Sequence, residues 1–181
     1  MLLVFTDGST LGNGKKNATG GIGIYIVETD LTYSILSEYS YSQICTKLSV
    51  DCNIDSKLLF PVTNQKCELL AIKKALLILN EKFNSYQGNI MLYSDSMYSI
   101  NCVTKWYKSW KVSGWKNTKK QDVKNKEIIQ DILCLLENKR NLSFHHIKSH
   151  KEKPKEASDL EILKWTGNDK ADKLATQKIE N

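Results

Sequence analysis

Four acidic residues stand in settings that could bring their side chains together: Asp7 in FTDGS, Glu68 in KCELLA, Asp95 in YSDSMYS and Asp172 in GNDKADKLA. Three of them adjoin apolar runs typical of strands or open a helical pattern, so folding should draw them to the edge of a core. Carboxylates are costly there without a counter-charge. Divalent cations supply that charge, because Mg²⁺ prefers carboxylate oxygens. Two such ions about 4 Å apart can clamp the attacking and leaving oxygens of a phosphodiester.

Each acid taken singly also has an ordinary structural interpretation. Asp7 is a suitable turn residue, and Glu68 is a favourable charge at a helix N-terminus. Asp95 can cap a helix, and Asp172 can be a solvated helix residue. For any one of them alone, these interpretations are favoured. The case for a shared site therefore depends on the elements that position all four.

The first third of the chain predicts an antiparallel meander of three strands. A short apolar strand over residues 2–6 ends at Asp7, and the turn-rich stretch over residues 8–21 predicts a loop. The segment GIGIYIVE alternates isoleucines on one face, and a less regular run spans about residues 33–41. Asp7 is thereby placed at the end of the first strand.

The rest of the chain alternates helices with strands. Apolar positions recur at three and four residues from Glu68 onward, which predicts a helix with Glu68 in its first turn and Asn64 as its cap. Next come a strand NIMLYS ending at Asp95, helices from about Ser96 and over about residues 124–137, a strand LSFHHIKS, and a closing helix over residues 169–178. The alternation favours parallel strands here, whose carboxyl ends lie together. The sum is an α/β fold, a five-stranded mixed β-sheet flanked by α-helices.

The net charge of +6 is concentrated in residues 105–126, which hold eight lysines against the single acid Asp122. Trp106, Tyr107, Trp110 and Trp115 lie among these lysines. Lysines interleaved with aromatic rings suit phosphates and flat sugars or bases, so a polyanion is the natural partner. A solvated amphipathic helix with inward-packed tryptophans explains the same composition about equally well.

Size and composition limit the remaining possibilities. The 181 residues suit one domain over residues 1–181. No apolar stretch is long enough to cross a membrane, and no secretory leader is evident. We therefore expect an intracellular protein, in cytoplasm or nucleus, monomeric and with no obligatory protein partner. The five cysteines are odd in number and form no CxxC pattern, which favours reduced packing thiols over disulfides or zinc.

The motifs taken together resemble the catalytic domain of type 1 ribonuclease H over nearly the whole chain. TDGS, xELxA, SDSxY, TKWYKSWKVSGWK with VKN, IKSH and GNDKADKLA occur in the order of that family. The resemblance implies a ribonuclease H-like fold. It also implies endonucleolytic hydrolysis of the RNA strand of RNA/DNA hybrids, giving 5′-phosphate and 3′-hydroxyl ends.

The resemblance further implies a set of site residues. Asp7, Glu68, Asp95 and Asp172 would hold two Mg²⁺ ions, with Mn²⁺ able to substitute, and His150 would assist proton transfer or product departure. The predicted contacts to RNA 2′-hydroxyls are Asn13, Asn64 and Gln65, and those to the DNA strand are Thr63, Trp106 and Asn125. The basic handle, residues 105–126, would act through Lys105, Lys108, Lys111, Lys116, Lys119 and Lys120.

Some features depart from the family pattern, and other functions stay open. Residues 42–62 and 151–166 are expected to be insertions, the second enlarging the loop of His150. Since the chain begins at its first strand, we expect no separate hybrid-binding module. The alternatives are a non-catalytic nucleic-acid-binding module, a DNA-acting nuclease of the same superfamily, and an RNase H domain cut from a reverse transcriptase.

Overall fold

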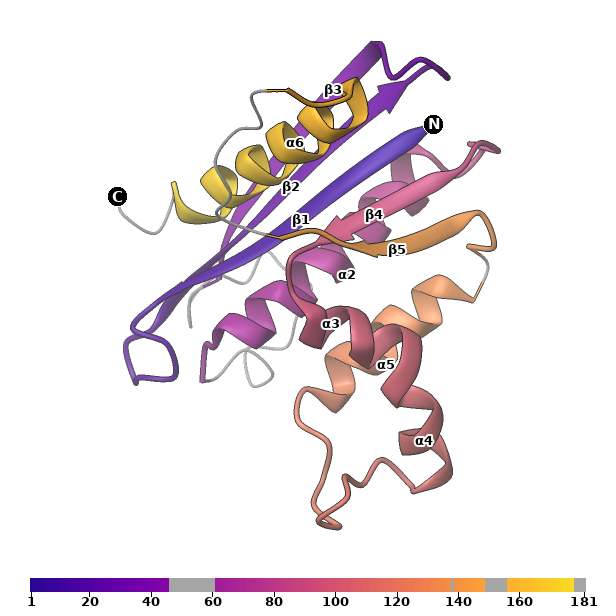
Figure 1. Ribbon diagram of the computed structural model, residues 1–181. Coiled ribbons are helices and arrows are strands. Elements are labelled where there is room, and N and C mark those ends of the chain that lie inside the picture. The colour runs from indigo at the N-terminus through magenta and orange to yellow at the C-terminus, as the bar shows by residue number, and fades with distance from the viewer. Residues whose placement is uncertain (46–60, 138, 149–155, 178–181) are drawn as a thin grey trace.

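A five-stranded sheet in the order β3-β2-β1-β4-β5 forms the centre of the protein (Figure 1). The computed structural model describes residues 1–45, 61–137, 139–148 and 156–177. The strands are β1 (Leu2–Leu11), β2 (Thr19–Thr29), β3 (Ile35–Cys45), β4 (Ile90–Ser94) and β5 (Leu142–His146). The pairs β1/β2 and β2/β3 are antiparallel, and β1/β4 and β4/β5 are parallel. The predicted meander, the mixed sheet and the parallel second half are confirmed.

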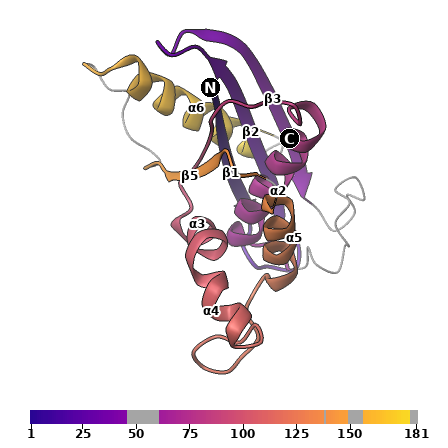
Figure 2. The ribbon, with the colours of Figure 1, turned by 90° about the vertical axis from the view of Figure 1, so that its right-hand side faces the viewer.

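Helices cover both faces of this sheet. Helix α6 (Asp159–Thr176) lies on one face, and α2 (Asn64–Lys82) lies on the other with α5 (Lys126–Leu136) packed behind it (Figures 1 and 2). Strand β1 is buried on both sides, because Leu2 and Val4 join the cluster under α2 whereas Leu3 and Phe5 join the cluster under α6. Burial of each such side chain contributes about 1.5–3 kcal/mol. The two clusters therefore fix β1, and Asp7 with it, at the centre of the molecule.

Strands β1 and β2 continue through much of the glycine-rich stretch, contrary to the predicted loop over residues 8–21. They pair from Leu2 with Glu28 to Leu11 with Thr19, so only residues 12–18 form the connecting loop. Glycines weaken a strand, but here they face helices that a side chain would displace. A Cβ on Gly8 would lie 2.2 Å from the backbone nitrogen of Glu68, and one on Gly20 would lie 2.4 Å from Cys67 Sγ.

The start of α2 differs slightly from the prediction. Thr63 is the N-cap, since its Oγ1 accepts a hydrogen bond of 3.3 Å from the backbone N–H of Lys66, and Asn64 is the first helical residue. Glu68 consequently lies just beyond the first turn. Among the described residues, Cys67 and Cys102 are buried thiols outside any disulfide, as expected for packing cysteines, whereas the thiol of Cys134 is exposed.

The closing helix starts ten residues earlier than Asp169. Ser158 caps α6 in a reciprocal capping box with Glu161, so residues 159–166 are helical, contrary to the expected inserted loop. Residues 149–155, including His150, lie outside the described residues. Of the other expected insertion, residues 42–45 belong to β3 and residues 46–60 also lie outside the described part of the chain.

The basic segment extends away from the sheet beyond β4 (Figures 1 and 2). Helix α3 (Met97–Asn101) continues into a π-helical turn, η2 (Cys102–Trp106), and then into α4 (Tyr107–Val112) before a long connection reaches α5. Among the described residues, no helix has the length and apolar character needed to cross a membrane.

Candidate metal centre and substrate surface

The parallel pairing of β1 with β4 brings Asp7 and Asp95 together. The last residue pair in this register is Thr6 with Ser94, and each aspartate is the next residue of its chain segment. Because parallel strands end at the same edge, both carboxylates emerge at one point. The placement of these two aspartates is thus confirmed, although β1 itself runs on to Leu11.

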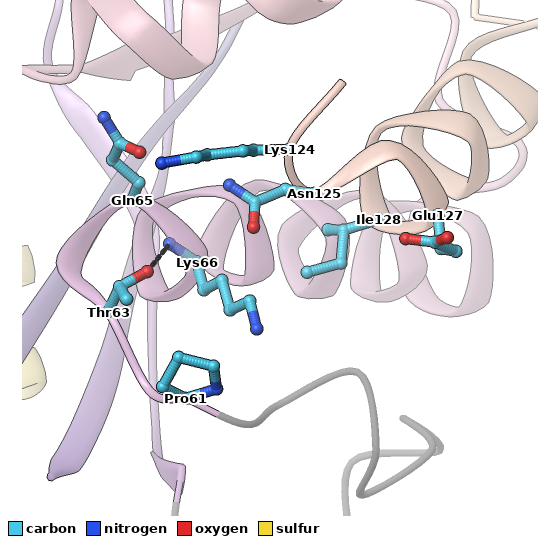
Figure 3. A pocket seen from close by; sticks show the side chains of 8 residues that line it. All are labelled: Pro61, Thr63, Gln65, Lys66, Lys124, Asn125, Glu127 and Ile128. Atoms are coloured by element: carbon cyan, nitrogen blue, oxygen red, sulfur yellow. Dashed lines mark hydrogen bonds between the residues drawn. The ribbon is translucent and has the colours of Figure 1, made fainter. Parts of the chain in front are cut away.

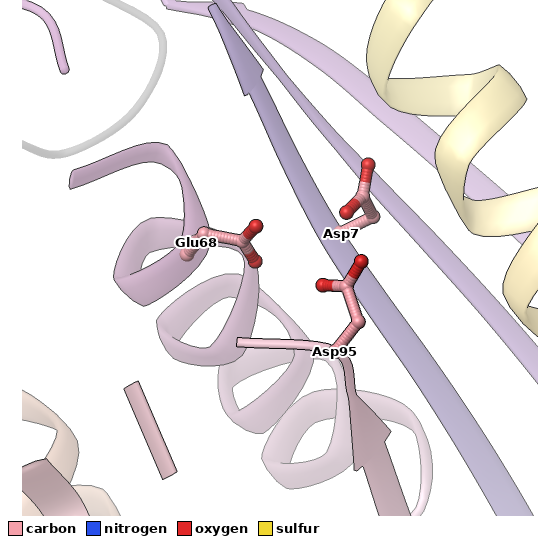
Figure 4. Close-up of side chains that lie close together, drawn as sticks. All are labelled: Asp7, Glu68 and Asp95. Atoms are coloured by element: carbon pink, nitrogen blue, oxygen red, sulfur yellow. The ribbon is translucent and has the colours of Figure 1, made fainter. Parts of the chain in front are cut away.

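Glu68 reaches the same point because α2 packs closely on β1 at Gly8. The absence of a side chain at Gly8 allows the helix backbone at Glu68 to contact the strand directly. As a result, one ligand oxygen from each of Asp7, Glu68 and Asp95 lies within 4.8 Å of the others (Figure 4). Gly8 belongs to the TDGS motif, and its packing role was the part of that motif missed by sequence reasoning.

The carboxylates of Asp7, Glu68 and Asp95 lie close together, and those of Asp7 and Glu68 are largely shielded from solvent. Asp7 is 7% exposed and Glu68 is 5% exposed. Burial, followed by the charges of Asp95 and Asp172, raises the pKa of Asp7 to about 7. Burial, followed by the charges of Asp7 and Asp95, raises the pKa of Glu68 to about 10. The backbone N–H of Gly8 opposes both shifts only in part.

The donor set fits a divalent cation. Within the described residues, Glu68 Oε2 is buried without a hydrogen-bond partner. An unpaired buried carboxylate oxygen is expensive, and a bound cation removes that cost. Three oxygen donors from carboxylates are also the ligand type that Mg²⁺ and Mn²⁺ prefer.

Asp172 lies near this trio but outside it. It is carried by α6, which approaches the sheet closely because Gly23 and Gly167 lack side chains. A Cβ on Gly23 would lie 2.0 Å from the Ala171 carbonyl oxygen, and one on Gly167 would lie 2.3 Å from the Phe5 ring. The charge of Asp172 contributes to the raised pKa of Asp7. Asp172 thus adds negative potential at the rim.

Backbone contacts hold the turn that carries Asp95. The backbone N–H of Ser96 donates to Ser94 Oγ at 3.1 Å, and the N–H of Met97 donates to the Asp95 carbonyl at 3.1 Å. His146 Nε2 lies 3.2 Å from the same carbonyl oxygen. The alternation of His145 and His146 within a strand favours a packing or surface role for His146. It is exposed, but its ring also links β5 to this turn.

Two of the three predicted RNA-contacting residues touch each other. The backbone N–H of Asn64 donates to Asn13 Oδ1 at 3.1 Å, which links the β1–β2 loop to the start of α2. Gln65 is the next residue of α2, and all three residues are exposed. All three residues therefore lie at the N-terminal end of α2, the helix that carries Glu68.

A cavity of about 410 Å³ lies between the starts of α2 and α5 (Figure 3). Thr63 and Asn125, the predicted contacts to a DNA-strand phosphate, both line it, together with Lys66 and Lys124. Asn125 adopts a left-handed backbone conformation, with φ of 58°, and its Nδ2 donates to Tyr98 Oη at 3.2 Å. Burial lowers the pKa of Lys66. Sequence reasoning missed Lys66, and it counted Lys124 in the basic segment without placing it beside Asn125.

The basic handle presents a row of aromatic rings beside its lysines. Trp106 is 40% exposed, and the centroid of its ring lies 6.0 Å from that of Tyr98 and 5.9 Å from that of Trp110. Trp110 and Trp115 pack against the core, as the alternative interpretation of this segment expected. All six predicted handle lysines are exposed: Lys105, Lys108, Lys111, Lys116, Lys119 and Lys120. Lys116 also pairs with Asp122 at 2.7 Å.

Comparison with known proteins points to one family. A family model described as RNase H matches residues 1–180. Ribonuclease H of Clostridium botulinum is 31% identical over 180 residues, which cover 99% of this chain and 95% of that protein. Ribonuclease H1 of Mus musculus is 29% identical over 97% of this chain but only 49% of its own length. The solution structure of the RNase H domain of prototype foamy virus matches with a TM-score of 0.68 and 26% identity, covering 97% of this chain and 92% of that one.

Proposed function

This chain belongs to the RNase H family, and we propose that it is an endonuclease that hydrolyses the RNA strand of RNA/DNA hybrids to give 5′-phosphate and 3′-hydroxyl ends. The observation that carries the proposal is the convergence of Asp7, Glu68 and Asp95, with ligand oxygens within 4.8 Å, on the edge of the sheet. Relatives named ribonuclease H and ribonuclease H1 support the same activity.

The proposed cofactor is a pair of Mg²⁺ ions, with Mn²⁺ able to substitute. Asp7, Glu68 and Asp95 would hold them, and Asp172 would contribute from the rim. When bound, such ions activate a water for in-line attack and stabilise the leaving 3′-oxygen. The chain supplies fixed carboxylates for this purpose, since β1, α2 and β4 are packed elements and need no rearrangement. His150 would assist proton transfer or product departure, and it lies outside the described residues.

Amide side chains near the metal centre would distinguish RNA from DNA. A ribose 2′-hydroxyl both donates and accepts hydrogen bonds, and an amide matches either role. The hydrogen bond between Asn13 and Asn64 supports this assignment, because it holds two of the three amide residues in one place. Gln65 would extend the same contact along the RNA strand.

The DNA strand would lie across the cavity and the handle. The hydroxyl of Thr63 and the amide of Asn125 line a cavity with two lysines and one acid, Glu127, so a phosphate would meet hydrogen-bond donors and a net positive charge. Trp106 offers a partly exposed ring for a sugar, and the handle lysines would neutralise further phosphates. Because these contacts go to sugars and phosphates, sequence preference should be slight.

A panel of substrates tests this proposal. Uniformly labelled RNA/DNA hybrid, double-stranded RNA, double-stranded DNA and single strands should be incubated with the protein, with Mg²⁺ and with chelator. We expect cleavage of the hybrid alone, only with the metal, and with 5′-phosphate ends. Preferential cleavage of double-stranded DNA would support a DNA-acting nuclease, and binding without cleavage would support a non-catalytic module. Either result would contradict the proposal.

A further inference from the structure

The loop that joins β1 to β2, residues 12–18, carries a concentration of positive charge that the proposed site does not use. Lys15 and Lys16 are adjacent and exposed, and residues 8–27 contain no acidic residue. Among the described residues, neither lysine takes part in the ion pairs found in the structure. The charge of this loop is therefore available to an external anion.

Hydrogen bonds brace this loop against the start of α2. The backbone N–H of Gly14 donates to the Val62 carbonyl at 2.9 Å, and Asn13 Oδ1 accepts from the N–H of Asn64. Within the loop, the N–H of Lys15 donates to the Gly12 carbonyl and its own carbonyl accepts from Ala18. Gly12 and Gly14 adopt the positive φ values of 69° and 72° that this tight path requires. These hydrogen bonds hold the loop backbone in place, so the two lysines extend from a fixed position.

The position of the loop determines which strand it can reach. In Figure 1 the loop lies at the lower left and the handle at the lower right, with the start of α2 between them. Asn13, a proposed contact to an RNA 2′-hydroxyl, is two residues before Lys15. The handle and the cavity of Thr63 and Asn125, which Gln65 also lines, are the proposed DNA contacts, and the handle lies across the start of α2 from the loop. Because Asn13 belongs to the same short loop, an RNA strand bound at Asn13 would pass close to Lys15 and Lys16.

We propose that Lys15 and Lys16 form a second basic contact, which binds phosphates of the RNA strand and holds the hybrid from the side opposite the handle. This inference rests on the proposed function. In this arrangement the handle lysines contact the DNA strand, and the loop lysines contact the RNA strand. Since phosphate contacts position a duplex without selecting its sequence, the loop acts on affinity and placement rather than on the chemical step.

The test compares two double variants of the full chain. Lys15→Ala with Lys16→Ala removes the loop charges, and Lys139→Ala with Arg140→Ala removes the same charge just before β5, at the opposite end of the sheet from Asp95. Binding of a hybrid, in chelator to prevent cleavage, is measured over a range of salt concentrations. We expect the loop variant to lower the slope of log K against log salt by roughly 1–2, as loss of two phosphate contacts predicts. We expect KM in Mg²⁺ to rise with kcat unchanged. Equal slopes for the parent and the loop variant, or equal effects of the two variants, would overturn the inference.

Neutral backbone linkages identify the strand. When methylphosphonates replace the phosphates of the RNA strand, the loop variant should bind as well as the parent, because the charge that the lysines contact is absent. When they replace phosphates of the DNA strand, the difference between variant and parent should persist. The opposite pattern would overturn the assignment to RNA. If the assignment to RNA fails but the parent still cleaves the hybrid, the proposed function stands. A parent protein that cleaves no hybrid would refute the proposed function itself.

Discussion

Removing one negative charge from the metal centre should stabilise the metal-free protein. Asp7 is buried beside Glu68 and Asp95, and its pKa is raised from 3.8 to about 7. The folded chain therefore binds a proton at Asp7 more tightly than the unfolded chain does. Stability due to this proton is complete below a pH near 4 and is lost as the pH rises through 7.

The size of this effect follows from the pKa shift. Raising the pKa of Asp7 by about three units contributes about 4 kcal/mol to the free energy of unfolding at low pH, and all of this contribution is lost above pH 7. Asp7→Asn keeps the size of the side chain and removes the charge, so the metal-free variant should recover part of this energy. At roughly 2–4 °C per kcal/mol for a chain of this size, Tm should rise by about 5–10 °C.

Thermal unfolding in chelator, followed by circular dichroism from mildly acidic to mildly alkaline pH, measures the effect. The parent should lose stability as the pH rises, and the variant should lose less. Added Mg²⁺ should raise the Tm of the parent much more than that of the variant, because binding stabilises only a competent site. Asp122→Asn is the matched control, since Lys116 lowers the pKa of that exposed carboxyl and its loss should give no stabilisation. An Asp7→Asn protein no more stable than the parent, with the same pH dependence, would refute the reasoning.

Three further predictions, two of them with a matched control variant, test the packing and the substrate surface. Gly8→Ala places a Cβ 2.2 Å from Glu68 N and should cost about 1–3 kcal/mol in urea unfolding and weaken Mg²⁺ binding. Gly14→Ala, which meets no atom within 4 Å, should cost only about 1–2 kcal/mol through its positive φ and leave Mg²⁺ binding intact. Thr63→Ala should cost about 1 kcal/mol through the lost cap, and Thr63→Ser should restore it; equal stabilities of the two would contradict the cap. Neutralising Lys116, Lys119 and Lys120 together should weaken hybrid binding and lower its salt slope by roughly 2–3, and an unchanged slope would contradict the handle.

Much of the fold and the core of the site follow from local patterns. The continuous apolar runs of β1 and β4 and the alternating isoleucines of β2 indicate strands, and the alternation of helices with strands indicates parallel pairing. These two features are enough to place Asp7 and Asp95 at one edge of the sheet. The helical spacing after Glu68 is sufficient to place that residue near the start of α2.

What sequence reasoning missed depends on contacts between distant segments. Glycine usually disfavours strands, so the continuation of β1 and β2 through Gly8 and Gly20 can be recognised only with α2 packed against them. The early start of α6 does have a local signal, the Ser158-x-x-Glu161 capping box, which the predicted helix boundary overlooked. The link from His146 to the Asp95 carbonyl arises from the β4–β5 register and has no signature in either segment.

The central claim is that Asp7, Glu68 and Asp95 bind a metal ion. Locating a bound metal in a crystal tests this claim most directly. Crystals grown with Mn²⁺, examined by anomalous diffraction, should show at least one strong peak bonded to oxygens of Asp7, Glu68 and Asp95, at about 2.2 Å. The Asp95→Asn protein crystallised in the same way should show the peak weakened or absent. A parent structure without anomalous density among these three carboxylates, at a Mn²⁺ concentration that supports hybrid cleavage, would contradict the account.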